Sequence, residues 1–110
     1  MIKKYTKFFK ALGEPTRLKI LKILAEREMC VCELMEIMEM NQPRVSQHLK
    51  VLKDAGVISE RKQAQWNYYS LCCEDFHDFV NAFVAFIQDD LKNISELAAE
   101  CQRMYKGSQM

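Results

Sequence analysis

The feature of the sequence that most constrains the fold is a change in hydrophobic period after residue 56. In residues 5–55 apolar side chains recur every three or four positions, which is the period of helices that bury one face. Residues 57–71 (VISERKQAQWNYYSL) instead alternate as strands do, and a polar turn at 62–65 divides them. The helical period returns in residues 74–105. The chain is therefore predicted to be mainly α-helical with one small β-hairpin.

Four helices are expected before the hairpin, because breaking residues divide the first periodic stretch. Gly13 is typical of a helix end, and Pro15 fits the first turn of the helix that follows. Asn41 is a capping residue shortly before Pro43, and Gly56 ends the helix that Pro43 begins. The predicted helices cover residues 5–12, 14–26, 32–39 and 43–55.

The length of 110 residues predicts a single domain, residues 1–110, because so short a chain cannot form two full cores. No apolar run approaches the roughly 18 residues of a membrane span. The basic N-terminus also lacks the apolar core of a signal peptide. We therefore expect a cytoplasmic protein without membrane contact. Its five cysteines are then predicted to be thiols that bind metal, react or pack in the core.

The net charge of +1 hides an uneven distribution. Residues 1–27 carry eight lysines and arginines against two glutamates, a net +6, and residues 41–67 carry five against two acids, a net +3. Residues 74–100 carry seven acids and one lysine, a net −6. Basic N-terminal and central segments with an acidic C-terminal segment suit a protein that presents one face to a polyanion. Solvated helix faces with a chance imbalance are the alternative.

A short helix, a tight turn, a second helix and a basic hairpin follow one another in the order of a winged helix-turn-helix. The second helix of this motif enters the major groove, and here its first turn is polar. Candidates for contact with base edges and phosphates of double-stranded DNA are Gln42, Arg44, Ser46, Gln47 and His48, and candidates for phosphate contact are Lys50, Lys53, Arg61 and Lys62. The alternative is a solvated helix beside an ordinary hairpin, and His48 also fits a buried, hydrogen-bonded role.

Two cysteines, Cys30 and Cys32, lie one residue apart in a segment predicted to be helical. Residues two apart in an intact helix are separated by about 200° around its axis. One ion could therefore bind both sulfurs only if residues 30–32 left helical geometry. Two thiolates select soft ions such as As(III), Sb(III), Cd(II), Pb(II), Zn(II) or Cu(I). Small core residues are the alternative role for this pair.

The final apolar stripe is longer than the core of so small a protein can cover. It runs from Phe76 to Tyr105 at helical spacing and includes Cys101, for which core packing is the expected role. We expect a seam between the helices of a homodimer, with the helix over 5–12 in the same interface. Cys72 and Cys73 precede the stripe, and adjacent cysteines do not easily form a disulfide or a chelate without strain.

Together these segments resemble the ArsR/SmtB family of bacterial metal-responsive repressors, over essentially the whole chain. LGEPTRLKIL is similar to the second helix of that family, NQPRVSQHLKVLKDAGVI to its recognition helix and ERKQAQWNYYSL to its wing. EMCVCELM resembles the metal box of the arsenic-responsive branch, with Cys30 and Cys32 at the first two ligand positions. The resemblance implies a winged helix-turn-helix homodimer (α-α-α-α-β-β-α) that leaves a pseudo-palindromic operator when As(III) or Sb(III) binds.

The sequence departs from the enterobacterial arsenic sensors at Met35, where those proteins carry a third cysteine. A thioether is a poorer ligand for As(III) than a thiolate is. The identity of the third ligand therefore stays open among Cys72, Cys73 and Cys101, in the same or the other subunit, and a small cellular thiol.

Ion binding is expected to unwind or shift the start of the third helix and so re-aim residues 42–50 on the DNA. A coupling between two such sites is typically ~1–3 kcal/mol. The rival interpretations are a repressor that senses another soft ion or thiol oxidation and, from a different class, a small thiol metal carrier or redox protein. The basic helix and hairpin argue against the second class, as does the lack of a C-x-x-C pair beside a strand. Neither an enzyme activity nor a catalytic cofactor is expected.

Overall fold

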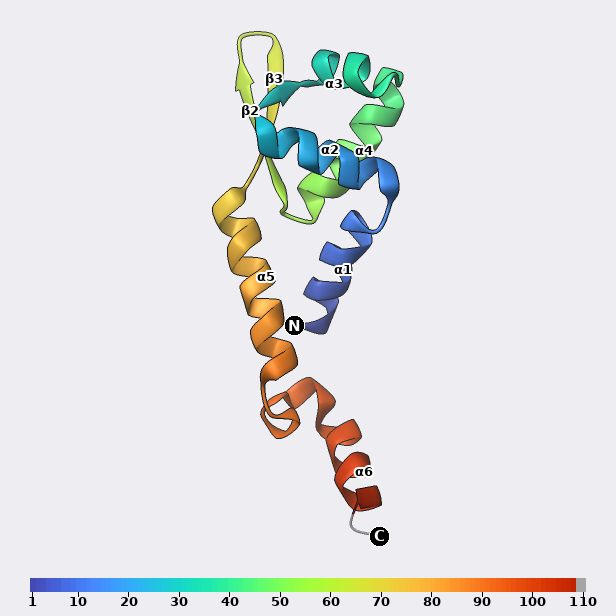
Figure 1. Cartoon of the computed structure of the whole chain (residues 1–110), viewed down its shortest axis with the longest axis vertical. Helices are drawn as coiled ribbons and strands as arrows, with labels where there is room; N and C mark the ends of the chain where they lie inside the picture. The colour runs from blue at the N-terminus through green and yellow to red at the C-terminus, as the bar shows by residue number, and fades with distance from the viewer. Residues whose placement is uncertain (109–110) are drawn as a thin grey trace.

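The computed structural model describes residues 1–108 and confirms a mainly helical protein with a small antiparallel sheet (Figure 1). The helices are α1 (Ile2–Leu12), α2 (Pro15–Glu26), α3 (Val31–Met38), α4 (Gln42–Asp54), α5 (Cys73–Gln88) and α6 (Ala98–Ser108). The strands are β1 (Met29–Cys30), β2 (Ile58–Gln63) and β3 (Trp66–Leu71). Two 3₁₀ turns, η1 (Leu91–Asn93) and η2 (Ser95–Leu97), separate α5 from α6.

Local signals account for where the central helices begin and end. The Glu14 carboxylate accepts a hydrogen bond from the Arg17 backbone N–H at 2.9 Å and caps α2. Asn41 Oδ1 accepts from the Arg44 N–H at 3.0 Å and caps α4 in the same way. Helix α3 ends at Met38 and is capped by Glu39, whose φ of 53° and ψ of 49° place it in the left-handed region. This residue makes the turn between α3 and α4.

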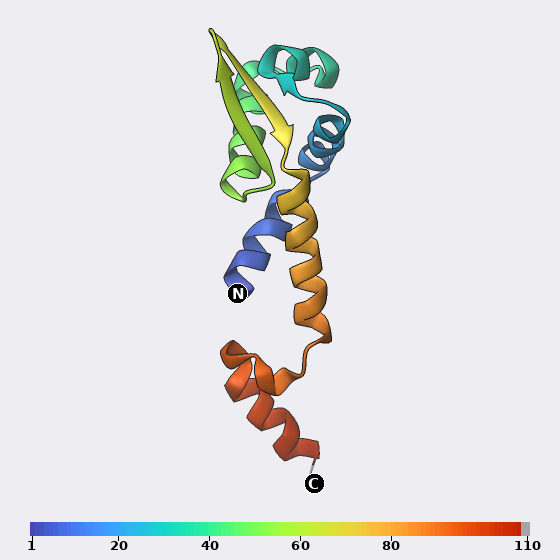
Figure 2. The ribbon, with the colours of Figure 1, turned by 90° about the vertical axis from the view of Figure 1, so that its left-hand side faces the viewer.

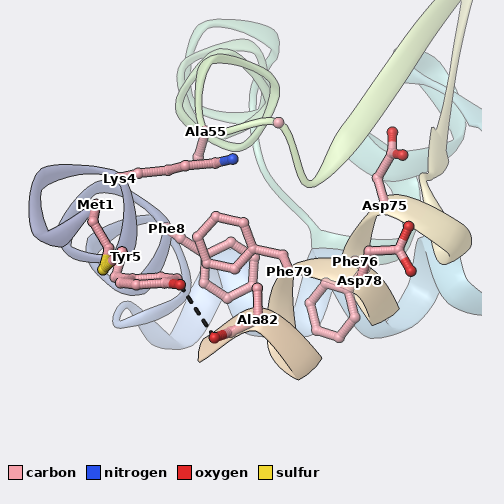
Figure 3. Close-up of a pocket in the computed structure, with 11 residues that line it drawn as sticks. Met1, Lys4, Tyr5, Phe8, Ala55, Asp75, Phe76, Asp78, Phe79 and Ala82 are labelled. Atoms are coloured by element: carbon pink, nitrogen blue, oxygen red, sulfur yellow. Dashed lines mark hydrogen bonds between the residues drawn. The ribbon is translucent and has the colours of Figure 1, made fainter. Parts of the chain in front are cut away.

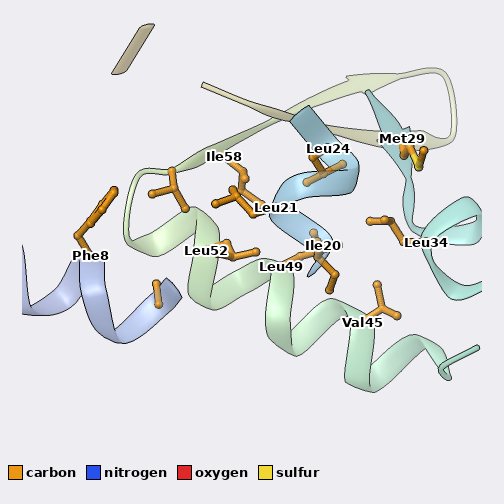
Figure 4. Packing of buried hydrophobic residues seen from close by; sticks show 12 residues of the cluster. Phe8, Ile20, Leu21, Leu24, Met29, Leu34, Val45, Leu49, Leu52 and Ile58 are labelled. Carbon is orange, nitrogen blue, oxygen red and sulfur yellow. The ribbon is translucent and has the colours of Figure 1, made fainter. Parts of the chain in front are cut away.

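One hydrophobic core joins the first four helices to the sheet (Figure 4). The apolar face of α4 lies at its centre, where Val45, Leu49 and Leu52 are at most 1% exposed. The other buried members lie on α1, α2, β1 and α3 and at or just before the start of β2: Phe8, Ala11, Ile20, Leu21, Leu24, Met29, Leu34, Val57 and Ile58. Because the opposite face of α4 takes no part in this core, it is open to a partner.

The sheet has three strands in the order β1-β3-β2 (Figure 1). Strands β2 and β3 form the predicted hairpin, and the sequence prediction missed β1. Strand β1 pairs antiparallel with β3, with Cys30 opposite Tyr68 and Met29 opposite Tyr69. Across β3, Tyr68 also pairs with Arg61 of β2. A strand of two residues is too short to show an alternating period in the sequence, and it is defined only by its hydrogen bonds to β3.

The expected long final helix is broken, and this is a correction to the sequence prediction. Helix α5 ends at Gln88, and α6 begins ten residues later, beyond the two 3₁₀ turns (Figures 1 and 2). Asp89 Oδ1 accepts from the Asp90 N–H at 2.8 Å and from Asn93 Nδ2 at 3.0 Å. Such local side-chain bonds compete with the helical ladder. The resulting arm extends the molecule to 63 × 23 × 19 Å.

Helices α1 and α5 pack through aromatic side chains (Figure 3). Phe8 stacks on Phe79 with ring centroids 4.0 Å apart, and the Tyr5 hydroxyl donates to the Ala82 carbonyl at 3.2 Å. A hollow of about 640 Å³ beside them is lined by α1, α5 and the end of α4. None of the described residues 73–88 is fully buried, although this helix carries much of the predicted stripe. Among residues 1–108, no helix is long and apolar enough to cross a membrane.

Candidate nucleic-acid interface and thiol site

The outer face of α4 carries most of the side chains that the sequence singled out for DNA contact. Gln42, Arg44, Gln47 and Lys50 are exposed, and Ser46 is half-buried. They lie outside the core because α4 turns Val45, Leu49 and Leu52, three or four positions apart, toward the core. Their donors and acceptors are the types that read base edges and bind phosphate in a major groove.

His48 occupies a more enclosed position than the other candidates. Its side chain is 17% exposed, and Nδ1 lies 3.8 Å from Glu14 Oε2, at the start of α2. This nitrogen has no hydrogen-bond partner among the described residues. The pKa of Glu14 is lowered, mainly by the Arg17 backbone N–H and to a smaller extent by His48. The histidine therefore faces α2, a contact that nothing in the sequence indicated.

Lys53, at the end of α4, is tied to the wing. Its Nζ donates to Glu60 Oε1 at 2.6 Å, and Glu60 Oε2 accepts from the Tyr69 hydroxyl at 2.9 Å. The hydrogen bonds from Lys53 and Tyr69 lower the pKa of Glu60, while Glu60 raises the pKa of Lys53. Burial, together with the bond to Glu60, raises the pKa of Tyr69 to about 12. The pair connects the end of α4 to β2, and Glu60 offsets the positive charge of Lys53.

The second wing cation, Arg61, is also paired. Its Nε lies 2.8 Å from Glu28 Oε2 and its Nη2 lies 2.6 Å from Glu28 Oε1, which is a two-pronged contact. Its Nη1 donates to Gln63 Oε1 at 2.7 Å. The hydrogen bonds lower the pKa of Glu28 and raise the pKa of Arg61. Lys62 forms no ion pair within residues 1–108 and is exposed.

The two cysteines of the metal box do not lie in one helix, so that part of the prediction is wrong. Cys30 is in β1 and is the N-cap of α3, with extended backbone (φ −87°, ψ 168°). Only Cys32 belongs to the helix, in its first turn. Cys30 is buried and Cys32 is exposed. Because the pair straddles the start of the helix, the 200° separation expected within an intact helix does not apply.

A capping box holds this helix start in place. Glu33 Oε1 accepts from the Cys30 backbone N–H at 3.1 Å, and the Cys30 side chain faces the Glu33 N–H. Arg27 Nη1 donates to Glu33 Oε2 at 2.9 Å. The bond from the Cys30 N–H, followed by the bond from Arg27, lowers the pKa of Glu33. The spacing C-x-x-E in the sequence carried this signal, with cysteine in the place of the usual serine or threonine.

The structure does not bring a third thiol to the pair. Cys72 lies four residues beyond Tyr68, the partner of Cys30, and this is about 13 Å along a strand. Cys73 is the first residue of α5, and Cys101 lies on α6. Among the described residues, no three histidine, cysteine or acidic side chains are grouped as a metal site. Met35 is half-buried on α3.

A helix-turn-helix with an open polar recognition helix, flanked by a basic β-hairpin, defines a winged helix-turn-helix DNA-binding protein. The model of the arsR family of bacterial regulatory proteins matches residues 14–60. The chain belongs to this family and is a transcriptional repressor; its fold and relatives are those of regulators, not of enzymes.

Three proteins illustrate the similarity. A helix-turn-helix transcriptional regulator of Methanocaldococcus jannaschii is 49% identical over 67 residues, which are 60% of this chain and 75% of that one. The arsenical resistance operon repressor of Staphylococcus xylosus is 33% identical over 105 residues, 96% of this chain and 95% of that one. The homodimeric winged helix-turn-helix domain from Mycobacterium bovis superposes with a TM-score of 0.67 at 26% identity, over 84% of this chain and 86% of that one.

Proposed function

We propose that this protein is a homodimeric repressor that releases its operator when As(III) or Sb(III) binds Cys30 and Cys32. The observation that carries the proposal is the position of the pair at the junction of β1 and α3. This junction touches both DNA-contacting elements, since β1 pairs with the wing strand β3 and α3 leads directly into the recognition helix α4. The name of the Staphylococcus xylosus relative supports a metalloid as the inducer.

The proposed site has one exposed thiol, which an ion can reach from solvent, and one buried thiol, which binds the ion second. Cys32, on the surface, meets the ion first, and Cys30 must then leave its capping position on Glu33 to bind it. That movement weakens the capping box and shifts the start of α3 relative to α4. The third sulfur comes from a small cellular thiol or from Cys72, Cys73 or Cys101 of a second subunit. Because both cysteines must stay reduced to bind the ion, we place its action in a reducing compartment such as the cytoplasm.

A titration of operator release tests the thiol site. Arsenite is expected to weaken the binding of wild-type protein to DNA from its own upstream region about 5–150-fold. Cys30→Ser and Cys32→Ser should each retain operator binding but lose this response, while Met35→Cys should respond at lower arsenite. Cys72→Ser, Cys73→Ser and Cys101→Ser, made singly, show whether one of these thiols supplies the third sulfur. Full release of the Cys30→Ser/Cys32→Ser double variant by arsenite would overturn the site, and release by diamide but not by arsenite would favour a thiol-oxidation sensor.

A substitution on the recognition helix tests the DNA interface. Gln47 is exposed on α4, and Gln47→Ala should weaken binding to the specific operator by about 1–3 kcal/mol, the size of one good base contact. Binding to random DNA should change little. Gln102→Ala, an equally exposed glutamine on α6, is the control and should leave both affinities unchanged. An unchanged ratio of specific to random affinity in Gln47→Ala would refute the placement of α4 in the groove.

A further inference from the structure

We infer that the Glu28–Arg61 ion pair is the connection through which the state of Cys30 reaches the wing. The inference rests on the proposed function, because it concerns how that site is coupled to DNA binding. It gives Arg61 a role different from the simple phosphate contact that its charge suggested. Arg61 is a positioning residue that acts through β1.

The register of the sheet places the relevant side chains in one row. Cys30 of β1, Tyr68 of β3 and Arg61 of β2 are directly opposite one another across the three strands. Directly paired residues project from the same face of a sheet. Glu28 precedes Cys30 by two residues and therefore belongs to the same face of this extended segment. The thiol and the ion pair thus share one side of the sheet.

The Arg61 side chain crosses β3 to reach its partner. Its guanidinium carbon lies 4.9 Å from the centre of the Tyr68 ring, and its Nε and Nη2 contact the two Glu28 oxygens at 2.8 and 2.6 Å. With Nη1 on Gln63, all three nitrogens of the guanidinium have protein partners. The contact joins β2 to the residue immediately before β1, although 33 residues separate Glu28 from Arg61 in the chain.

This arrangement converts movement at the thiol into movement of the wing. Strand β1 has only two residues, so it is the least firmly held strand of the sheet. When an ion draws Cys30 away from its capping position, Glu28 moves with the same segment. The two-pronged contact resists rotation, so Arg61 and β2 follow the segment. The wing then leaves the geometry of the metal-free protein.

The surface position of the pair makes it testable without damage to the fold. The Arg61 side chain is 52% exposed and that of Glu28 is 32% exposed, and such pairs contribute little to stability. Trp66, the sole tryptophan, is the first residue of β3 and is 43% exposed, so its fluorescence reports on the wing in the absence of DNA. Arsenite affinity is measured separately by calorimetry.

The experiment compares wild type, Glu28→Gln, Arg61→Gln and the double variant, with Glu26→Gln as the control because Glu26 forms an exposed pair with Lys22 at 2.8 Å. We expect Glu28→Gln to bind arsenite within about threefold of wild type, a change of ~0.7 kcal/mol or less. It should nevertheless lose most of the arsenite-induced change in Trp66 emission. The ratio of its operator affinities without and with arsenite should be at least threefold smaller than that of wild type. The double variant should lose no more than either single variant, because one contact is removed in all three.

The possible outcomes separate the inference from the proposed function. If wild type neither binds arsenite nor releases DNA, the proposed function fails and the inference falls with it. If wild type responds and Glu28→Gln shows the same Trp66 change and the same ratio of operator affinities with and without arsenite, only the inference is overturned. A variant that loses operator affinity equally with and without arsenite also overturns it, since a purely structural role for the pair gives that result.

Discussion

The part of the molecule from α1 to β3 and the part from α5 to α6 use apolar residues in opposite ways. The first part buries them in a continuous core, with Ile20, Leu34 and Leu52 fully inaccessible. In the second part only Ile94 is buried among the described residues, and Ile87 is 64% exposed. The same helical period therefore builds a buried core in one region and leaves an exposed apolar surface in the other.

The difference shows that the DNA-binding part completes its core within one chain, whereas the C-terminal helices leave apolar side chains exposed. Helix α5 packs on α1 along one side, and Glu96 holds the arm to α1 through the N-terminal ammonium at 2.9 Å and the Ile2 N–H at 3.2 Å. These polar contacts fix the direction of the arm but cover little apolar area. In the proposed homodimer, the same apolar face of a second α5 covers this side.

The difference in burial between the two parts is tested most directly by truncating one apolar side chain in each part. Leu49→Ala should lower the free energy of unfolding by about 2–5 kcal/mol, because the side chain is 1% exposed and leaves a cavity. Ile87→Ala should cost no more than about 0.5 kcal/mol in dilute solution. Urea unfolding measures both variants. A loss in Ile87→Ala that grows with protein concentration would identify dimer contacts, whereas an equal loss at all concentrations would contradict an open surface.

A charge on the apolar face of α5 tests the need for a second copy. Val84 is 45% exposed, so Val84→Glu should leave the isolated chain folded but weaken its self-association at least about 100-fold, or ~2.7 kcal/mol. Sedimentation velocity at several concentrations gives the association constant, and Val84→Ala controls for the loss of the side chain alone. Two-fold symmetry also predicts operator half-sites about 34–36 Å apart. A monomeric wild type at micromolar concentration, alone and on DNA, would refute the seam.

The smallest expected effect concerns the turns that end α3 and α5. Glu39 adopts a left-handed conformation at φ 53°, so Glu39→Gly should raise the free energy of unfolding by about 0.5–1 kcal/mol. Asp89→Ala, in the exposed turn after α5, should lower it by only about 0.5 kcal/mol or less. Thermal unfolding of both variants provides the test. A destabilised Glu39→Gly would show that the Glu39 side chain makes a contact that outweighs the backbone strain.

Much of the fold and of the candidate site followed from local sequence signals. Asn41 and Pro43 located the start of the recognition helix, and the alternating residues 57–71 located the wing. The exposed face of α4 could be predicted because a helix that buries Val45 and Leu49 must present Gln47 on its other side. These features depend on residues within a few positions of one another, which is why periodicity and capping residues are sufficient to find them.

The sequence by itself determined the first four helices, the wing and the cysteine pair, because each of these depends on the chemistry of neighbouring residues. Only the tertiary structure decided that Cys30 lies in a strand and caps α3, since β1 exists through its pairing with β3 some forty positions later. It also decided that Arg61 binds Glu28, a partner 33 residues away. A two-residue strand and a surface ion pair leave no periodic trace, because their energies depend on which segments the completed core brings together.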